Sequence, residues 1–375
     1  MKYLRLVFAS FLLTAFLLTS CDKKEDELVQ DTLPENFKVD VPSSLTSKTQ
    51  QKSAKVSELS GDEIYEHLRF FIGVGDEAAE LVQEIIQSIR QHNLGQAMSF
   101  SYVSDDDGRT KNVVIIENSE FDGQTWQYEL TVTDAESEAE GDGGYAMQVF
   151  WNNNPVQGIA ILKPENINRN DDDEGWSKAM FRIDYSEVGE YGYEKSMIVY
   201  ISDLPTPETD IFAISSMKMF VGKNGDVVDV YGNSAHPNAV LFESEAGFDW
   251  AFAAAGNDKS GLGTAEVGLP PYLLDESSRE VLLGDYSIHN VYTNLIQTWF
   301  FEEYGTYIDD ITLGAYLENA EAPGFFNQNG FVGSGTAPSD DFSELTESIQ
   351  SLTPYNPLSI ANLEVNFKKD EDSVK

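Results

Sequence analysis

The chain has 375 residues, of which 41% are hydrophobic and 23% are charged, as in an ordinary folded protein. Its 24 basic and 64 acidic residues give a formal net charge of −40. So acidic a chain repels a phosphate backbone, which excludes nucleic acid as the expected partner. The single cysteine excludes a disulfide framework and a cysteine-rich zinc site.

The first 20 residues have the pattern of an export signal peptide. Lys2 and Arg5 precede a mostly apolar run, residues 6–18, which is too short to span a bilayer as a helix of the mature protein. The run ends in Leu18-Thr19-Ser20-Cys21, which resembles a bacterial lipobox. The resemblance implies that Cys21 is acylated, becomes the mature N-terminus and anchors the protein in a lipid bilayer. Two or three acyl chains on one residue give stable anchoring.

A charged run follows this cysteine and consists of Lys23, Lys24, Glu25, Asp26 and Glu27. It resembles the surface-export signal of lipoproteins from the Bacteroidetes group, which implies an outer-membrane protein that faces the cell exterior. The periplasmic face of that membrane is the alternative. In enteric-type bacteria, an aspartate directly after the lipidated cysteine implies retention at the inner membrane instead. A solvated tether would also explain the charges.

Residues 21–59 are polar and poor in aromatic side chains, so they cannot bury enough apolar area to offset the entropy of ordering. We therefore predict a flexible tether, in which residues 37–42 add a short extended piece to the fold. The remaining residues, 60–375, are expected to form a single β-rich globular domain.

The domain is predicted to begin with a helical region over residues 60–95. Ser60 and Glu63 fit a capping box, and apolar residues then recur at helical spacing. Gly73-Val74-Gly75 interrupts the pattern, and Gly95 follows it as a C-terminal glycine. These features predict a helical hairpin or a kinked helix with one apolar face.

Residues 97–270 change to a period of two, which predicts antiparallel strands. Alternation is clear over residues 126–133, 181–185 and 248–252, and turn signals separate such runs. We expect about ten strands, joined mostly by short hairpin-like links. A long meander must curl or close to protect its edges, so the expected shape is a curved sheet, a half-barrel or a barrel.

The last part, residues 271–375, is expected to form a helical and mixed cap. Apolar residues from Leu282 to Trp299 fit a helical stripe, and Asp341 with Glu344 fits a second capping box. Residues 360–367 alternate like a last strand. The fold class is thus mostly β with helices (α+β), with a long meander flanked by N-terminal and C-terminal helices.

Metal binding has weak support in the sequence. The four histidines, His67, His92, His236 and His289, lack the spacing of a helical metal site. Acidic clusters occur at residues 105–107, 134–142 and 171–174. The last of these is the candidate site for calcium, a cation that prefers oxygen ligands. The candidate ligands are Asp171, Asp172, Asp173 and Glu174. Solvated loops that keep the protein soluble are the preferred interpretation, with no metal.

Aromatic residues, 12% of the chain, carry the remaining functional signal. Phe325, Phe326 and Phe331 lie in a Gly- and Asn-rich segment, residues 324–335, which predicts a loop whose rings contact a ligand. Aromatic residues of the segment 299–307 also lie close to Glu302-Glu303 and to Asp309-Asp310. A sugar site needs acids beside aromatic rings, but a core helix with its solvent edge fits this segment better.

The sequence favours a non-enzymatic role, because it holds no Gly-x-Ser-x-Gly motif and its cysteine is assigned to lipid. We expect an anchored β-rich module that binds a ligand or a protein partner, or that serves the envelope structurally. A curved sheet closed by helices is similar in outline to the lipoprotein-carrier fold of the bacterial envelope. A carrier of a lipid or other apolar ligand is therefore the first alternative. A glycan-active hydrolase with paired carboxylates is the second.

Overall fold

The computed structural model describes residues 33–48, 60–90, 98–170, 176–208, 210–239 and 247–368. The predicted signal peptide, the lipidation site Cys21 and the charged run over residues 23–27 lie outside the described residues. Among the helices that are described, none is long and apolar enough to cross a membrane.

One 13-stranded sheet dominates the structure, and its strands follow one another in sequence order. Every pairing between neighbours is antiparallel. The strands are β1 (Met98–Val103), β2 (Thr110–Phe121), β3 (Gln124–Asp134), β4 (Tyr145–Asn153), β5 (Val156–Leu162), β6 (Met180–Ser186), β7 (Lys195–Ser202), β8 (Ser216–Asn224), β9 (Val227–His236), β10 (Phe248–Asn257), β11 (Leu262–Gly268), β12 (Gly324–Asn327) and β13 (Gly330–Ser334).

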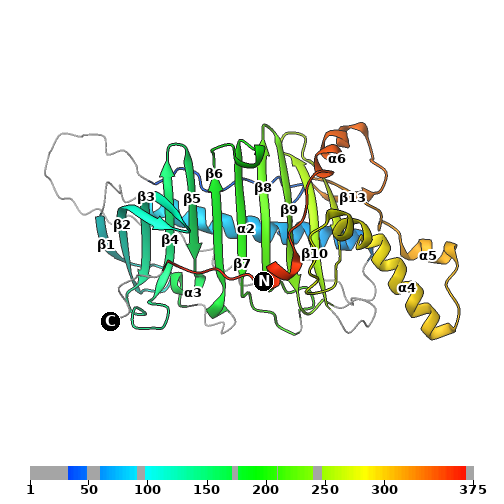
Figure 1. The fold of residues 1–375 in the computed structure, drawn as a ribbon, viewed down its shortest axis with the longest axis horizontal. Coiled ribbons are helices and arrows are strands. Elements are labelled where there is room, and N and C mark those ends of the chain that lie inside the picture. The colour runs from blue at the N-terminus through cyan, green and yellow to red at the C-terminus, as the bar shows by residue number, and fades with distance from the viewer. Residues whose placement is uncertain are drawn as a thin grey trace.

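The prediction of a mostly β protein with a long antiparallel meander is confirmed, but the sheet does not close into a barrel. Its order begins at β1 and ends at β13, so these two strands form its edges (Figure 1). The last hairpin, β12–β13, occupies residues that we predicted to be a loop. Short turns join most neighbours; for example, Asp122 and Gly123 both have positive φ, at 54° and 74°, between β2 and β3.

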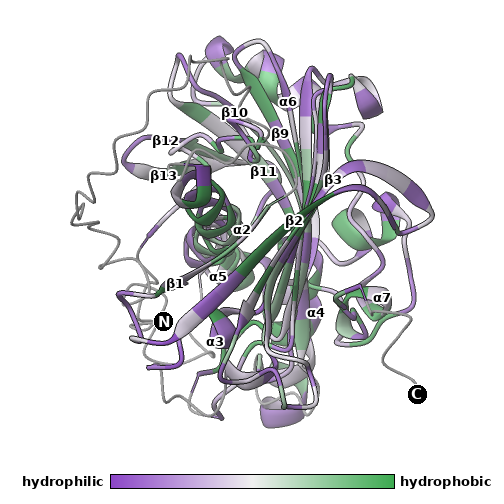
Figure 2. Cartoon of the chain, turned by 90° about the vertical axis from the view of Figure 1, so that its left-hand side faces the viewer, coloured by the Kyte–Doolittle hydropathy of each residue, from purple (hydrophilic) through white to green (hydrophobic). Residues whose placement is uncertain are grey.

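A long helix, α2 (Gly61–Arg90), runs across the strands behind the sheet as Figure 1 is drawn. Its 30 residues extend roughly 45 Å, which is enough to cross about nine strands at their usual spacing. Figure 2 shows α2 against one side of the sheet, and we name this side the covered face. The helix fills the space that would be the lumen of a half-barrel, so the sheet stays open around it.

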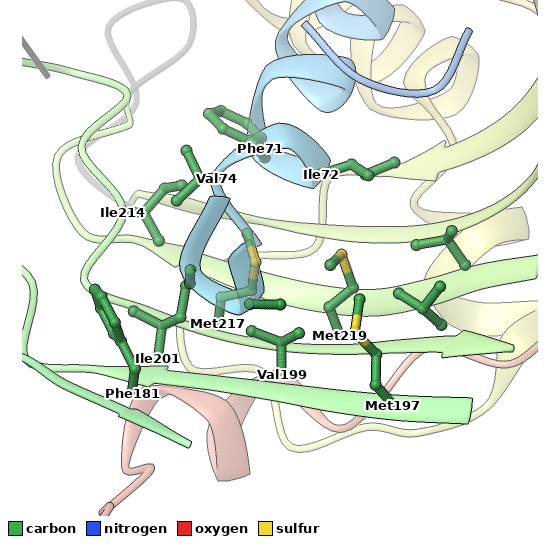
Figure 3. Close-up of a cluster of buried hydrophobic side chains, with 14 of the residues drawn as sticks. Phe71, Ile72, Val74, Phe181, Met197, Val199, Ile201, Ile214, Met217 and Met219 are labelled. Atoms are coloured by element: carbon green, nitrogen blue, oxygen red, sulfur yellow. The ribbon is translucent and has the colours of Figure 1, made fainter. Parts of the chain in front are cut away.

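The core lies between α2 and the covered face. In Figure 3, Phe71, Ile72 and Val74 of the helix meet side chains from the middle strands. The strand side chains labelled there are Phe181, Met197, Val199, Ile201, Met217 and Met219, and all are buried. Because both layers contribute large apolar side chains, this interface supplies much of the free energy of folding.

The predicted hairpin or kink in the first helix is wrong, because α2 continues through Gly73-Val74-Gly75. These glycines allow close packing instead. A Cβ atom on Gly73 would lie 2.8 Å from the backbone oxygen of Ser47, and one on Gly75 would lie 2.5 Å from the Met219 side chain. A glycine inside a helix costs about 1 kcal/mol relative to alanine. Here the absence of a side chain at both positions lets the backbone of Ser47 and the side chain of Met219 approach the helix.

The segment 33–48, in which we expected only residues 37–42 to join the fold, packs against the fold along its length. Leu33, Phe37, Val39 and Leu45 are buried. On α2, the guanidinium of Arg69 donates to the backbone oxygens of residues 43, 44 and 46 at 2.8–3.0 Å, which satisfies these three acceptors. The part of the chain that packs on the sheet therefore begins well before the predicted boundary at residue 60.

The opposite side of the sheet, which we name the open face, is covered only in part. Helix α6 (Ser343–Ile349) packs on the small side chains of β10, namely Ala251, Ala253 and Ala255. Helix α7 (Pro357–Ala361) and the chain after it cross the same face (Figure 1). The predicted last strand over residues 360–367 is therefore wrong. Val365 and Phe367 nevertheless pack onto a small apolar cluster of this face.

Short elements complete the fold. The described ones are α3 (Pro164–Ile167), α4 (Ile288–Tyr304), α5 (Asp310–Tyr316), η2 (Trp176–Lys178), η3 (Glu190–Gly192), η4 (Glu280–Asp285) and η5 (Asp340–Phe342). Helices α4 and α5 extend outward from the end of the sheet that holds the last strands (Figure 1).

Candidate functional site on the open face

A groove with a volume of about 570 Å³ lies on the open face. Its floor comes from β5, β6 and β7, and the tip of the β2–β3 hairpin and the η3 turn also line it. This volume is within the range of about 300–1,000 Å³ that is usual for ligand sites.

Strand periodicity places the groove residues on this face. In β6, Phe181 and Ile183 point into the core, so Arg182 and Asp184 point the other way. In β7, Val199 occupies the core and Tyr200 therefore faces the groove. The same strands thus supply the apolar core on one side and polar and aromatic groups on the other.

Arg182 is the electrostatic centre of the groove. Its Nε donates to Asp184 Oδ1 at 2.6 Å, and its Nη2 donates to Asp122 Oδ2 at 2.7 Å. Burial alone would lower the pKa of Arg182, but the hydrogen bonds and charges of Asp184 and Asp122 outweigh it and raise that pKa. The guanidinium is therefore a fixed positive charge, held by two carboxylates at the groove surface.

Tyr200 lies between two cations. It pairs across the sheet with Arg182 on one side and with Lys218 on the other. The Arg182 Cζ atom is 5.4 Å from the centre of the Tyr200 ring, and the Lys218 Nζ atom is 5.2 Å from it. Lys218 Nζ also lies 4.3 Å from the ring centre of Tyr355, which comes from the C-terminal segment. These are cation–π contacts.

Burial shifts the two central groups toward their neutral forms. It lowers the pKa of the Lys218 ammonium, although the charge of Asp184 opposes this effect. It raises the pKa of the Tyr200 hydroxyl, so that tyrosine stays neutral and can both donate and accept a hydrogen bond.

An aromatic row continues from this point across the open face. Tyr355 is 5.7 Å from Tyr231, and Tyr231 stacks on Phe220 at 4.7 Å between ring centres. Phe220 in turn contacts Tyr191, at 5.4 Å, and Tyr193. Tyr191 belongs to both the row and the groove lining, and it is one of the more exposed aromatic side chains of the described residues. Phe220 is buried within the row, and its tyrosines are the members that reach the surface beside the charged floor.

Asp122 and Asp184 of the groove lack the arrangement of a glycosidase pair. Arg182 Nη2 binds Asp122 Oδ2 at 2.7 Å and Asp184 Oδ2 at 3.0 Å, so these two oxygens are at most 2.7 + 3.0 = 5.7 Å apart. The guanidinium occupies the space between them. A hydrolase needs a substrate or a water there, with the two carboxyl groups on opposite sides of the bond that breaks.

The three phenylalanines that we proposed as ligand contacts lie in the β12–β13 hairpin and not on a loop. Phe325 and Phe326 are fully buried: Phe325 contacts Phe342, and Phe326 packs near Tyr65. Phe331 is half-buried and stacks on Tyr65 at 5.4 Å. The expected exposure of Phe325 and Phe326 is wrong, because this hairpin completes the sheet over the start of α2.

The aromatic segment 299–307 is more exposed than we predicted. A core helix was the preferred interpretation, yet Trp299, Phe301, Tyr304 and Tyr307 are all exposed. Only the first half of α4 is buried, through residues such as Tyr292 and Ile296. The stripe that predicted the helix is correct, but its second half projects beyond the sheet.

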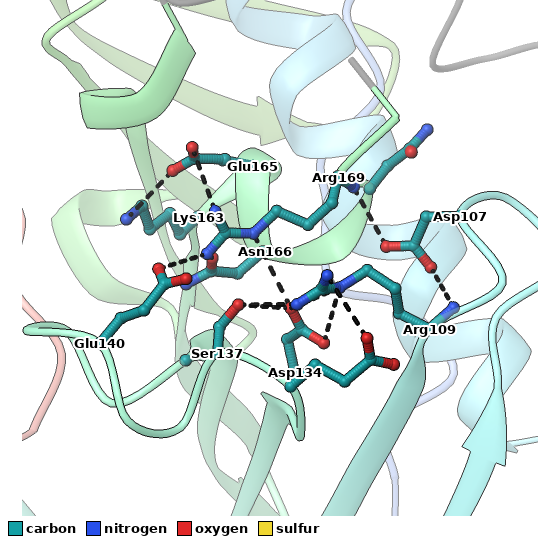
Figure 4. Close-up of polar contacts among 12 residues, drawn as sticks. Asp107, Arg109, Asp134, Ser137, Glu140, Lys163, Glu165, Asn166 and Arg169 are labelled. Atoms are coloured by element: carbon teal, nitrogen blue, oxygen red, sulfur yellow. Dashed lines mark hydrogen bonds and ion pairs between the residues drawn. The ribbon is translucent and has the colours of Figure 1, made fainter. Parts of the chain in front are cut away.

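The acidic loop over residues 134–142 is more than a solvated loop. Asp134 is fully buried and binds the Arg109 guanidinium, with Nη2 to Oδ2 at 2.6 Å, and it also accepts from Ser137 (Figure 4). Burial alone would raise the pKa of Asp134, but these hydrogen bonds outweigh it and hold that pKa below its usual value. Glu140 pairs with Arg169 at 2.9 Å in the same network.

A second cluster, residues 105–107, joins the same network. Asp107 and Lys111 form an ion pair at 2.8 Å, and both side chains are almost fully buried. Asp107 also accepts the backbone N–H of Arg169 at 3.1 Å, which ties the chain after α3 to the β1–β2 turn (Figure 4). The acids of this end of the sheet are thus partly structural, because they join loops that are distant in sequence.

The metal candidates have no support from the described residues, where no group of three or more His, Cys, Asp or Glu side chains is placed to hold a metal ion. The calcium candidates Asp171, Asp172, Asp173 and Glu174 lie outside those residues, as does His92. His67 of α2 and His236 of β9 are both buried, and His289 lies 2.9 Å from Glu321.

Sequence reasoning missed the groove, although part of its signal was present. The alternation over residues 181–185 already assigns Arg182 and Asp184 to the wet face. It does not reveal that Tyr200 and Lys218 stand beside Arg182, because that depends on the register of three separate strands. Tyr355 arrives from a segment more than 130 residues later in the chain.

The fold and the site thus define an open antiparallel meander with one face packed by a long helix and one face that carries a charged, aromatic groove. No family model, no curated protein and no solved structure matches the chain.

Proposed function

We propose that the protein is a non-enzymatic, lipid-anchored binding protein of the outer membrane, displayed on the cell exterior. We further propose that its open-face groove binds a glycan. The observation that carries this proposal is the position of Tyr200 on the floor of the groove, between Arg182 of the same floor and Lys218 of the neighbouring strand β8. The anchor and the display are proposals that depend on Cys21 and on the charged run after it.

A sugar ring can contact both the aromatic and the charged side chains of the groove. One face of a pyranose presents C–H groups, which pack well on an aromatic ring, while its rim presents hydroxyls. In the groove, Tyr191 and Tyr200 supply rings, and Arg182, Asp184 and Asp122 supply charged donors and acceptors for hydroxyls. Among the described residues, the lining holds one cation, Arg182, which is bound by Asp122 and Asp184, so we expect a neutral, polyhydroxylated ligand rather than an anionic one.

The carrier alternative requires an apolar cavity between α2 and the sheet. The side chains at that interface are instead packed and fully buried, among them Leu68, Ile72, Val199 and Met219. The groove described above lies on the other face and has charged walls. Both observations favour a polar ligand over a lipid.

Calorimetric titration with a panel of neutral oligosaccharides tests the proposed ligand class. The panel consists of gluco-, manno-, galacto- and xylo-oligosaccharides of four to six sugar units. At least one series should bind, and Tyr200→Ala should weaken that binding tenfold or more, because the sugar ring loses its aromatic platform. The same loss costs a stacked nucleic-acid base about 1–3 kcal/mol. Tyr316→Ala, which removes an exposed ring of α5, is the matched control. Binding that survives Tyr200→Ala unchanged, or no binding across the panel, contradicts the proposal.

Membrane fractionation tests the proposed anchor separately. Cys21→Ser should release the protein from membranes, because acylation is the proposed hydrophobic attachment. If the variant stays in the membrane fraction after a high-salt wash, another part of the protein anchors it.

Replacement of residues 23–27 by alanine should protect the protein from protease added to intact cells. Equal cleavage of both forms would reject surface display by this signal.

A further inference from the structure

The second half of α4 and the helix α5 expose an unusual number of large apolar side chains. The exposed fractions are 39% for Trp299, 45% for Phe301, 61% for Tyr304, 66% for Tyr307, 89% for Ile311 and 52% for Tyr316. We name residues 298–316 the aromatic arm. The arm extends from the end of the sheet (Figure 1), far from the open-face groove over β5–β7. Exposed apolar groups gathered in this way mark an interaction surface.

The arm is an ordered surface. Ser287 caps the start of α4 by accepting from the Asn290 N–H, and Gly305 ends the helix with a φ of 70°. Asp309 then caps α5 through the N–H groups of Ile311 and Thr312. Between the two helices Ile308 is buried, so the connection packs against the protein. The arm therefore presents its rings in a fixed arrangement and loses little entropy on binding.

The exposed rings pack against neighbouring rings of the arm, of which Phe300 is partly buried against the core. Phe301 stacks on Tyr307 with ring centres 4.9 Å apart, and Tyr304 lies 4.7 Å from Phe300 and 6.1 Å from Trp299. Trp and Tyr are the residues that most often dominate the binding energy of protein interfaces. The arm holds three such residues within nine positions of the sequence.

The charge of this region has a single sign. No lysine or arginine occurs between Arg279 and Lys368. The arm itself carries Glu302, Glu303, Asp309 and Asp310, all exposed. Its surface therefore combines aromatic faces with carboxylates, and both attract an arginine or lysine side chain, the former by cation–π contact and the latter by charge-assisted hydrogen bonds.

We propose that the aromatic arm is a docking site for a basic segment of another protein. A second copy of this chain fits poorly, because a symmetric contact would bring the same carboxylates of both arms together. An anionic bilayer is disfavoured for the same reason. Arginine suits the site best, since its planar group stacks on rings and binds carboxylates with two hydrogen bonds.

Fluorescence anisotropy with labelled dodecapeptides tests this proposal. The probes alternate arginine with serine, lysine with serine, and glutamate with serine. The arginine peptide should bind most tightly, the lysine peptide more weakly, and the glutamate peptide should not bind. Because the whole protein is acidic, the decisive comparison uses the variant Trp299→Ala/Tyr304→Ala/Tyr307→Ala, which removes rings and leaves every charge in place. Its affinity for the arginine peptide should fall at least tenfold.

Two controls separate the arm from other surfaces. Tyr200→Ala, in the groove, should bind the arginine peptide like the wild type. The melting temperature of the triple variant should stay close to that of the wild type, since the three substituted side chains are exposed.

Equal affinity of the wild type and the triple variant would overturn the proposal, because general charge attraction would then explain the binding. Failure of the arginine peptide to bind would also overturn it. So would an arm-dependent association of the protein with itself, with neutral or anionic phospholipid vesicles, or with the oligosaccharide panel.

Discussion

The covered face and the open face of the sheet are built by the same strands but carry different chemistry. In β6–β8 the covered face holds residues such as Met197, Val199 and Met219, which pack under α2. One position away, the open face holds Tyr200 and Lys218. Alternate residues of one strand therefore serve the core and the groove. Substitutions on the covered face should mainly lower the free energy of unfolding, and substitutions on the open face should mainly weaken ligand binding.

The largest effect is expected from a matched pair in β7. Ile201 is fully buried on the covered face, whereas Ile198 is half-buried in the lining of the groove. Ile201→Ala should lower the free energy of unfolding by about 2–5 kcal/mol, because it leaves a cavity under α2. Ile198→Ala should cost much less, since the open face can rehydrate. Urea unfolding of both variants measures the difference, and equal losses would show that the open face is as tightly packed as the covered one.

A second prediction concerns acid stability of the covered face. Burial lowers the pKa of His67 to about 4 and the pKa of His236 to about 3. The unfolded chain takes up protons near pH 6.5 and the folded chain does not, so these histidines make stability fall as the pH drops from about 6.5 toward 4. Asp249 has the opposite effect, because burial raises its pKa to about 7 and the folded protein is favoured as that carboxyl becomes protonated.

His67→Phe isolates the first of these groups. Within the described residues, neither ring nitrogen of His67 has a hydrogen-bond partner, and the ring lies 4.1 Å from that of Phe212, so phenylalanine suits the site. Between pH 7 and pH 4 the variant should lose about 3 kcal/mol less than the wild type. An unchanged slope in His67→Phe would show that the site accepts a charge when folded.

A smaller effect is expected in the acidic loop before β4. Asp134→Asn should lower the free energy of unfolding by about 1–3 kcal/mol, because it weakens a buried ion pair with Arg109. Glu136→Gln, in the same loop but exposed, should change it by less than about 0.5 kcal/mol. The low pKa of Asp134 means that its contribution is present above about pH 4 and is lost as the pH falls through the folded-state pKa. Similar effects of both variants would mean that the loop is uniformly solvated.

The smallest stability effect is expected at Lys218 on the open face. Burial lowers the pKa of this lysine, so its charge opposes folding slightly, and methionine removes that cost while it keeps the apolar stem. Lys218→Met should leave the free energy of unfolding within about 0.5 kcal/mol of the wild type while it weakens oligosaccharide binding. A strongly destabilised variant would show that Lys218 serves the fold.

The sequence predicts the meander and the first helix because both depend on local periodicity. The alternation in β3 and β6, and the apolar stripe after Ser60, each follow from one segment read alone. The continuous path of α2 through Gly73 could not be predicted, since it depends on the close approach of Ser47 and Met219. A glycine that breaks a helix and a glycine that admits a neighbour look the same in the sequence.

Exposure was the harder property to predict. The apolar stripe of α4 continues from buried Tyr292 to exposed Trp299 without any change of pattern. The helix leaves the sheet between these residues, and only the three-dimensional arrangement reveals it. The Gly- and Asn-rich composition around Phe325 and Phe326 suggested a loop, whereas pairing with β11 makes it a buried hairpin.

The most direct test of the central claim is hydroxyl-radical footprinting, read by mass spectrometry, of the protein with a bound oligosaccharide. If the open-face groove holds the ligand, Tyr191 and Tyr200 should be oxidised several-fold more slowly in the complex, whereas Tyr304 and Tyr307 of the aromatic arm should react as in the free protein. Protection of the arm with an unprotected groove would contradict the account, because the ligand would then bind where we place the protein partner.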